Sequence, residues 1–230
     1  MQRLVFLGIG SNNSDIFDAV LEINALKPTY EVLGYVTPDG NPASAERGVS
    51  CLGDFEAVRS LPEDVQVTGF AFGPGSYRTW PDTVAGLSLP PERFATVVHP
   101  RAYVSGQSTV GRGSVVLAGT TVGAFVTIGD HVIVLQNVGL SHHDVIGDYS
   151  CLAVGVSFSG NVRVGRNCFL GTNSTIIGAA IGEGSMVGAG ALIRHDVPPN
   201  EVWVGNPGRF LRKVEDREKP RRRKRSGEDG

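Results

Sequence analysis

The chain has 230 residues, 21 of them Lys or Arg and 23 Asp or Glu, and its formal net charge is −2. No run of 18 or more apolar residues occurs, which excludes a membrane-spanning helix, and we expect a soluble, cytoplasmic protein without a signal peptide. Residues 1–208 hold 11 basic against 18 acidic residues, whereas residues 209–230 hold 10 against 5. Because the tail is low in apolar residues, we expect it to be solvated and disordered. Because the body is acidic and no aromatic residue alternates with the charges of the tail, we expect no nucleic-acid binding.

Residues 1–98 carry the pattern of a small α/β domain. A strand at Arg3–Gly8, a helix capped by Asn13 or Ser14, and a strand at Glu31–Val36 predict a βαβ unit. Its glycine-rich first crossover is the usual place for a phosphate to meet a helix N-terminus. Asn13 stands where a dinucleotide fingerprint has a third glycine, so a simple tight turn is an equally good interpretation. Further elements are predicted in chain order: helix Asp54–Leu61, strand Val65–Phe72, a helical stretch near Arg78–Val84 and strand Phe94–Val98.

A six-residue repeat runs from Val104 to Ile193. Aliphatic or aromatic residues recur at every sixth position from Val104 to Ile176, and one five-residue step then resets the frame. A helix cannot keep every sixth residue on one face, but short strands that turn a corner every six residues can. Glycine often follows the aliphatic residue, where a side chain would crowd the backbone or require a positive φ. We therefore predict a left-handed parallel β-helix at residues 99–208, each coil made of three six-residue segments, followed by the tail at residues 209–230.

The repeat breaks its own rule at residues 140–147, Leu-Ser-His-His-Asp-Val-Ile-Gly. Asp144 occupies a position that otherwise holds small or β-branched residues, and His142 and His143 precede it. Histidine can take a proton near neutral pH, and a carboxylate can orient it. One coil further on, Gly160 would leave room for a substrate and expose an amide that could hold an oxyanion. The alternative is that the two histidines merely solvate an edge of the prism.

A metal site is the competing use of these histidines. The chain has five of them: His99, His131, His142, His143 and His195. His131 precedes the pair by less than one full coil and therefore does not stack over it, and His195 lies three coils away. Zinc sites need three or four converging ligands. We therefore expect no metal.

The chain resembles the bacterial sialic-acid O-acetyltransferase and nucleotide-amino-sugar N-acetyltransferase family. The resemblance covers residues 3–213, including the junction at His99 and the closing Gly-Asn-Pro at residues 205–207, and is most specific at residues 142–174. It implies a homotrimer with active sites between adjacent prisms. It also implies that acetyl-CoA lies along the prism, that the N-terminal domain holds a nucleotide-linked amino sugar, and that His142 is the catalytic base.

The resemblance also assigns binding residues. The acetyl-CoA contacts fall at Cys151, Gly160, Thr172 and Ala189. The nucleotide-sugar contacts fall at Gly10, Ser11, Asn12, Asn13, Thr37, Pro38, Asp39, Gly73 and Arg78. The family usually has an acid directly after the base, where this chain has His143, with Asp144 one residue later. The partner of His142 is therefore left open: it is His143, Asp144 or both. The family also often has His at the position of Cys151.

Three functions follow as hypotheses. The leading one is transfer of acetyl from acetyl-CoA to the amino group of a nucleotide-linked deoxy sugar, in surface-glycan biosynthesis, with His142 as general base. The second is O-acetylation of a sugar hydroxyl, for example on a sialic-acid-like acid. The third is a non-catalytic scaffold that binds a nucleotide-sugar or a partner through the prism.

Overall fold

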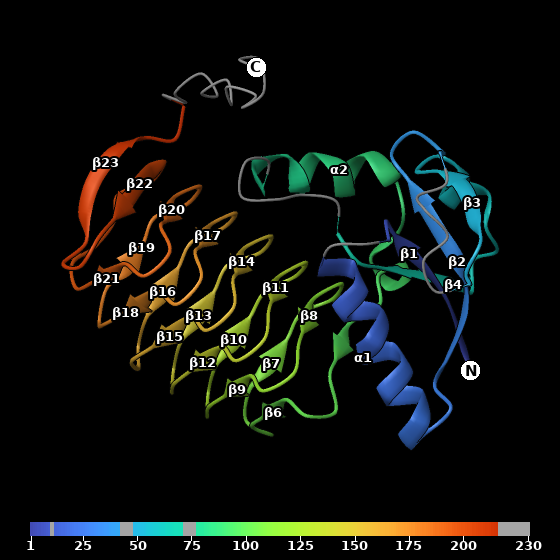
Figure 1. The fold of residues 1–230 in the computed structure, drawn as a ribbon, viewed down its shortest axis with the longest axis horizontal. Coiled ribbons are helices and arrows are strands. Elements are labelled where there is room, and N and C mark those ends of the chain that lie inside the picture. The colour runs from blue at the N-terminus through green and yellow to red at the C-terminus, as the bar shows by residue number, and fades with distance from the viewer. Residues whose placement is uncertain (10–11, 42–47, 71–76, 216–230) are drawn as a thin grey trace, which may run out of the picture.

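The computed structural model describes residues 1–9, 12–41, 48–70 and 77–215, in which a small sheet-and-helix half is followed by a long prism (Figure 1). An N-terminal parallel sheet and three sheets of short parallel strands confirm the predicted fold class, an α/β unit followed by a left-handed β-helix. Within the described ranges, no helix is long and apolar enough to cross a membrane. The predicted site residues Gly10, Ser11 and Gly73 lie outside these ranges.

The N-terminal half is a four-stranded parallel sheet. Its strands are β1 (Gln2–Leu7), β2 (Tyr30–Thr37), β3 (Cys51–Asp54) and β4 (Val65–Thr68), in the order β3-β2-β1-β4. Its helices are α1 (Asn12–Leu26), α2 (Trp80–Leu87) and the 3₁₀ turns η1 (Ala57–Ser60), η2 (Tyr77–Thr79) and η3 (Pro91–Arg93). The buried residues of β1, such as Leu4 and Phe6, pack against Ile16 and Val20 of α1 in one core.

Several element bounds differ from the sequence-based predictions. Helix α1 begins at Asn12, so Asn13 and Ser14 lie inside its first turn and do not cap it. The helix expected at Asp54–Leu61 is only η1, because the Asp54 carboxylate accepts the amides of Glu56 and Ala57, both at 3.0 Å, and fixes a tight entry. Strand β3 was not predicted, since its four residues form too short a run to show a period.

The prism consists of three parallel sheets. The first contains β7 (Thr109–Val110), β10 (Thr127–Ile128), β13 (Val145–Ile146), β16 (Arg163–Val164) and β19 (Ala180–Ile181). The second contains β5 (Val97–Val98), β8 (Val115–Val116), β11 (Ile133–Val134), β14 (Cys151–Leu152), β17 (Phe169–Leu170), β20 (Met186–Val187), β22 (Glu201–Val204) and β23 (Arg209–Lys213). The third contains β6 (Tyr103–Val104), β9 (Thr121–Val122), β12 (Gly139–Leu140), β15 (Ser157–Phe158), β18 (Thr175–Ile176) and β21 (Leu192–Ile193).

Strands stack one coil apart, as the repeat predicts. Ile146 pairs with Val164, one full coil later, whereas Val164 pairs with Ile181, one position short of a full coil, at the five-residue step. The inward-facing aliphatic residues, among them Val116, Leu152 and Ile176, form the apolar shaft of the prism. At its far end β23 folds back antiparallel on β22, which closes the second sheet (Figure 1).

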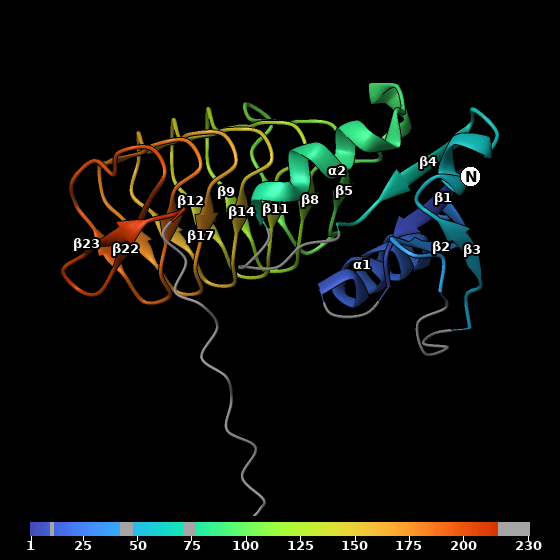
Figure 2. The ribbon, with the colours of Figure 1, turned by 90° about the horizontal axis from the view of Figure 1, so that it is seen from above.

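Residues of η2 and α2 cover the outer face of the second sheet, while the β1–β4 sheet lies beyond the end of the prism (Figures 1 and 2). Outward-facing Val115, Ile133, Cys151 and Phe169 share one apolar cluster with Tyr77, Trp80 and Val84. Figure 2 shows α2 running alongside β8, β11 and β14. The Tyr77 hydroxyl donates to the Gly184 carbonyl at 2.8 Å. The side of the prism formed by the second sheet is thus occupied by η2 and α2 of the same chain.

Candidate active site

The two adjacent histidines lie in the corner that joins β12 to β13, residues 141–144, here called the histidine corner. The side chains of His142 and His143 are both exposed, and His143 has a φ of +60°. Its amide donates to the Ala124 carbonyl one coil before, at 3.0 Å. This bond fixes the corner's backbone, so both imidazoles project from the edge between the third and the first sheet.

The His142 imidazole lies directly over Gly160, as counting one coil along the repeat predicts. A β-carbon at Gly160 would come within 2.6 Å of His142 Nε2 and 2.8 Å of Nδ1, so any other residue there would displace the ring. Gly160 belongs to the next corner along the same edge, residues 159–162, here called the glycine corner. The two corners are tied by the Asn161 amide, which donates to the His142 carbonyl at 3.0 Å.

His142 and His143 face each other through one nitrogen each. Their Nδ1 atoms are 3.2 Å apart, and the rings stand nearly perpendicular, at 81°. In such a pair one nitrogen must donate and the other accept. If His142 donates through Nδ1, its Nε2 carries the free lone pair that a general base requires. The exposed Phe125 ring lies 4.9 Å from that of His143, on its far side.

Asp144 is buried and bonded to the backbone. Its Oδ2 accepts the Ser141 amide and its Oδ1 accepts the Val162 amide, both at 2.8 Å. Burial raises the pKa of this carboxyl, while the two amides and the nearby imidazoles of His142 and His143 act in the opposite direction. Among the hydrogen bonds of the described residues, none joins Asp144 to an imidazole. The structure therefore places His143, and not Asp144, at Nδ1 of His142.

The Gly160 amide is available for a ligand. Its neighbour Asn161 donates to His142, but no hydrogen bond from the Gly160 N–H occurs within the described part of the chain. A base and a free amide on adjacent corners are the two groups that acyl transfer needs, one to take a proton and one to hold the developing oxyanion. The corner can therefore support that chemistry without a further ionisable group.

The other predicted acetyl-CoA contacts lie away from the histidine corner. Thr172 and Ala189 are exposed on successive corners between the second and third sheets, where the Gly190 amide donates to the Thr172 carbonyl at 2.8 Å. Cys151 points outward from the second sheet and is only 2% exposed, beneath the N-terminal half. Burial raises the pKa of its thiol to about 12, so it is no nucleophile at neutral pH.

Among the predicted nucleotide-sugar contacts, Asn13 has its amide fully engaged inside the fold. Its Nδ2 donates to the carbonyls of Leu7, at 3.1 Å, and Phe70, at 2.8 Å, and its Oδ1 accepts the Phe70 amide at 3.1 Å. It thus joins the ends of β1 and β4, with 7% of its surface exposed. Asn12 beside it is half-buried. Asn13, which stands where a dinucleotide fingerprint has its third glycine, is therefore a structural link in the described chain.

The turn after β2 is the more open part of that predicted site. Pro38 and Asp39 are exposed, and Thr37 is buried. Asn41 donates to Asp39 through its amide at 3.2 Å and its side chain at 2.8 Å, and these bonds lower the pKa of Asp39. Pro38 also lines a cavity of about 440 Å³ between η1 and α2. The carbonyl of half-buried Arg78 accepts the Asn167 side-chain amide at 3.4 Å, over a prism corner.

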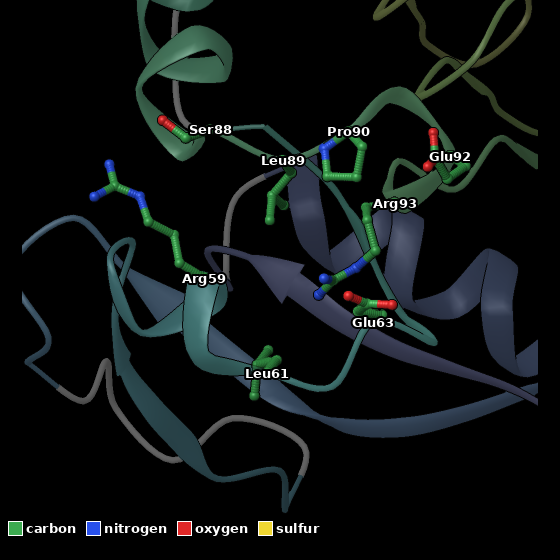
Figure 3. Close-up of a pocket in the computed structure, with 8 residues that line it drawn as sticks. All are labelled: Arg59, Leu61, Glu63, Ser88, Leu89, Pro90, Glu92 and Arg93. Carbon is green, nitrogen blue, oxygen red and sulfur yellow. The ribbon is translucent and has the colours of Figure 1, made fainter.

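A larger cavity, of about 530 Å³, lies between η1 and the loop before β5, and none of the predicted site residues lines it (Figure 3). Arg59 and Arg93 face it together with the carboxylates of Glu63 and Glu92. Within the described ranges, no group of three or more His, Cys, Asp or Glu side chains has the geometry of a metal site. The structure brings the predicted residues His142, His143 and Gly160 together at the histidine and glycine corners.

A single chain does not bring the predicted halves of the site together. The histidine corner joins the third sheet to the first, and the second sheet forms the remaining side of the triangle. The Arg78 carbonyl lies over a corner at the edge of that side, at Asn167, whereas β2, which ends at Thr37, belongs to the N-terminal sheet beyond the end of the prism (Figures 1 and 2). The sequence repeat could locate Gly160 by counting, but nothing in it indicated which side the N-terminal half covers. Phe125 was missed, although counting one coil back from His143 reaches it.

Known proteins share this chain's repeat. Residues 161–194 match a family described as the hexapeptide repeat of succinyl-transferase. Over 148 residues the chain is 36% identical to the galactoside O-acetyltransferase of Escherichia coli (strain K12), an alignment that covers 57% of this chain and 70% of that protein. The chain belongs to the hexapeptide-repeat acetyltransferases.

Two solved structures match this acetyltransferase over nearly its whole length. The acetyltransferase domain of PglB from Neisseria gonorrhoeae, in complex with acetyl coenzyme A, has a TM-score of 0.78 at 26% identity and covers 91% of this chain and 99% of that one. PerB from Caulobacter crescentus, in complex with CoA and GDP-perosamine, has a TM-score of 0.77 at 25% identity and covers 90% of this chain and 96% of that one. The N-terminal sheet and the prism therefore occur together in both.

Proposed function

We propose that this acetyltransferase transfers an acetyl group from acetyl-CoA to the amino group of a nucleotide-linked amino-deoxy sugar. The observation that carries the proposal is the His142 imidazole lying against Gly160, whose amide has no partner in the described chain. PglB and PerB, which were solved with acetyl-CoA and with CoA and GDP-perosamine, share both halves of the fold. We assign nucleotide-sugar binding to residues 1–98 and acyl transfer to residues 99–208.

In this mechanism transfer is direct. The neutral amine attacks the thioester carbonyl carbon while His142 Nε2 takes its proton, and the Gly160 amide donates to the carbonyl oxygen as it becomes an oxyanion. When the tetrahedral intermediate collapses, the carbon–sulfur bond breaks, and the proton on His142 goes to the departing CoA thiolate. The Nδ1–H of His142 donates a hydrogen bond to Nδ1 of His143, which holds the His142 ring in the required tautomer throughout.

The proposed site lies between chains of a homotrimer. In one chain the histidine corner is on the edge between the third and first sheets, whereas η2 and α2 cover the second sheet and the β1–β4 sheet lies beyond the end of the prism. We therefore propose that the nucleotide bound by one chain reaches the His142 of a neighbour. Thr172 and Ala189 stack on a different edge from Gly160, so a single acetyl-CoA is more simply reached by groups from two prisms. The turn at Thr37 to Asp39 and the adjoining cavity of about 440 Å³ are proposed to receive the nucleotide.

Sugar O-acetylation is the second candidate. It is favoured by the 36% identity to galactoside O-acetyltransferase, whose name indicates a hydroxyl acceptor. The same base and oxyanion donor would serve a hydroxyl, which must lose its proton during attack because it is a weaker nucleophile than an amine. The acceptor, and not the corner chemistry, distinguishes the two candidates.

The test is release of CoA thiol from acetyl-CoA in the presence of uridine-, guanosine- and thymidine-diphosphate amino sugars, free sialic acids and galactosides. We expect turnover on one amino sugar and a loss of at least about 10²-fold in His142→Ala, with the oligomeric state unchanged. Turnover on hydroxyl acceptors alone would replace the proposal by O-acetylation. Failure to bind acetyl-CoA at all would overturn both and point to a non-catalytic scaffold.

A further inference from the structure

We propose that Asp144 is a positioning residue that holds the histidine corner and the glycine corner in register, and that it does so through backbone amides without touching either imidazole. The inference rests on the proposed function, since it concerns the geometry of that reaction. It concerns the third member of the His-His-Asp run, whose role the sequence left open.

The carboxylate spans the two corners. Through Oδ2 it accepts the amide of Ser141, the residue before His142, and through Oδ1 the amide of Val162, two residues after Gly160. Both bonds are 2.8 Å long, and Asp144 has no exposed surface. One rigid, planar carboxylate therefore holds the backbone just before the base His142 and just after the oxyanion donor Gly160.

Equivalent positions elsewhere in the prism show what the carboxylate adds. Ser150 accepts the Cys168 amide at 3.0 Å and donates to the Gly165 carbonyl, also at 3.0 Å, and both partners belong to the next coil. Ser114 makes the same two bonds with Val132 and Gly129, each at 2.8 Å. Each serine hydroxyl thus makes two hydrogen bonds to the next coil. In the described chain, neither hydroxyl makes a hydrogen bond to a residue of its own corner.

Like the serines, Asp144 accepts an amide from the next coil, that of Val162. In place of the serines' bond to a carbonyl of the next coil, it accepts the Ser141 amide of its own corner. A serine would link the coils without placing a carboxyl group in the interior, where an ionised group is costly unless it is well compensated. The bond that only the carboxylate supplies is the one that holds the backbone immediately before His142. We infer that this bond keeps the imidazole over Gly160, since a shift of about 1 Å in a reacting group can reduce the rate about 10²-fold.

The decisive variant is Asp144→Ser. A serine at 144 can still accept the Val162 amide and can donate to the Ser159 carbonyl, as the serines at 114 and 150 do, but it leaves the Ser141 amide without its acceptor. We expect kcat to fall about 10²-fold while the urea midpoint stays close to that of the wild type and the KM for acetyl-CoA is unchanged.

Ser150→Ala is the matched control. It removes both coil-to-coil bonds at the equivalent position of another edge, so we expect a lower urea midpoint with kcat in the absence of urea unchanged. An unaltered kcat in Asp144→Ser would overturn the proposal. So would losses of kcat in both variants that scale with their losses of stability, because Asp144 would then be a structural residue only.

A second measurement needs no turnover. Nitrogen-15 NMR of histidine-labelled full-length protein reports the tautomer and hydrogen bonding of each ring, and His142→Ala identifies the His142 signals. We expect these signals to change in Asp144→Ser and to stay unchanged in Ser150→Ala. Unchanged His142 signals in Asp144→Ser would overturn the positioning role of Asp144 even if no acceptor is found. A wild type that turns over no acceptor would overturn the proposed function alone.

Discussion

Glycine serves two separate purposes in this prism. The glycines that follow the inward aliphatic residues, such as Gly147 and Gly165, have ordinary φ values, but a β-carbon there would come within 2.6 or 2.7 Å of the next coil's backbone. Close approach of coils, and not a left-handed conformation, is therefore why glycine is required. Positive φ occurs at the corners, where a second set of glycines, such as Gly113 and Gly119, adopts it, as do His143 and several asparagines.

Gly160 belongs to neither class, because what a β-carbon would meet there is the imidazole of His142. We expect Gly160→Ala to push the ring aside and lower kcat about 10²-fold or more, with little effect on stability, since His142 is exposed and can move. Steady-state kinetics and urea unfolding of the same preparation measure the two quantities.

Gly106→Ala is the control for that experiment. It lies two coils before His142 on the same edge, and a β-carbon there meets no atom within 4 Å. Equal loss of kcat in both variants would contradict the steric explanation and indicate a general effect of alanine on this edge.

At the scale of the elements, each coil is held by contacts to its two neighbours. Backbone bonds link each strand to the next coil, such as the bond from the Val145 amide to the Val162 carbonyl at 2.9 Å, and serine hydroxyls add further links between coils. Repeat proteins of this kind have stabilities close to a sum over neighbouring interfaces. A defect between two coils should therefore lower the stability of the prism by about the value of the contact that it disrupts.

Replacing glycine by alanine should consequently lower the free energy of unfolding in a prism coil and raise it in a helix. Gly165→Ala places a β-carbon 2.7 Å from the Glu183 amide, and we expect a loss of about 1–3 kcal/mol in the free energy of unfolding. Gly86→Ala in α2 meets no atom within 4 Å and should gain about 0.5–1 kcal/mol, because alanine loses less backbone entropy in a helix. Chemical denaturation of both variants tests the pair, and equal signs would contradict the coil-contact explanation.

At the scale of the whole molecule, an aromatic stack joins the two halves. His131, on a prism corner, meets the edge of Phe94 at 4.7 Å and stacks on Tyr149 at 5.0 Å. Arg166 extends the stack, with its guanidinium 4.7 Å from the Tyr149 ring centre. Phe94 belongs to the segment that enters the prism and also pairs with Val67 beside the N-terminal sheet. The stack therefore lies at the junction between the halves.

This junction should make stability depend on pH. Burial lowers the pKa of His131, against a smaller opposing effect of Asp130 and Asp148. The folded chain therefore binds this proton less readily than the unfolded chain, whose histidine has a pKa of about 6.5. The contribution of neutral His131 to stability is therefore complete above the pKa of the unfolded chain. It is lost as the pH falls through that pKa toward the lower pKa of the folded chain.

We expect the urea midpoint to fall more between pH 7.5 and pH 5.5 in the wild type than in His131→Asn. Asparagine suits this position because it tolerates the φ of +56° that His131 adopts. Groups that titrate in both proteins contribute equally to the two pH dependences, so the difference between the curves reports His131. Parallel curves would show that His131 does not contribute.

Much of the prism could be predicted from the sequence, because in a repeat fold each residue's neighbours follow from counting. Counting one coil on from His142 reaches Gly160, and the structure places the imidazole over that glycine. The five-residue step was likewise reproduced in the pairing of Val164 with Ile181. Asp144 was recognised as the exception to the repeat, and it is indeed a buried carboxylate.

The tertiary structure decided what counting along the chain cannot. The choice between His143 and Asp144 as the partner of His142 depends on side-chain directions within one corner, and there both oxygens of Asp144 turn to backbone amides. The role of Asn13 depends on Phe70, 57 residues away. The burial of Cys151 depends on a domain that covers one side of the prism. The repeating, local interactions of the prism follow from the amino-acid pattern alone, whereas contacts between distant segments are seen only in the folded chain, because no period relates their residues.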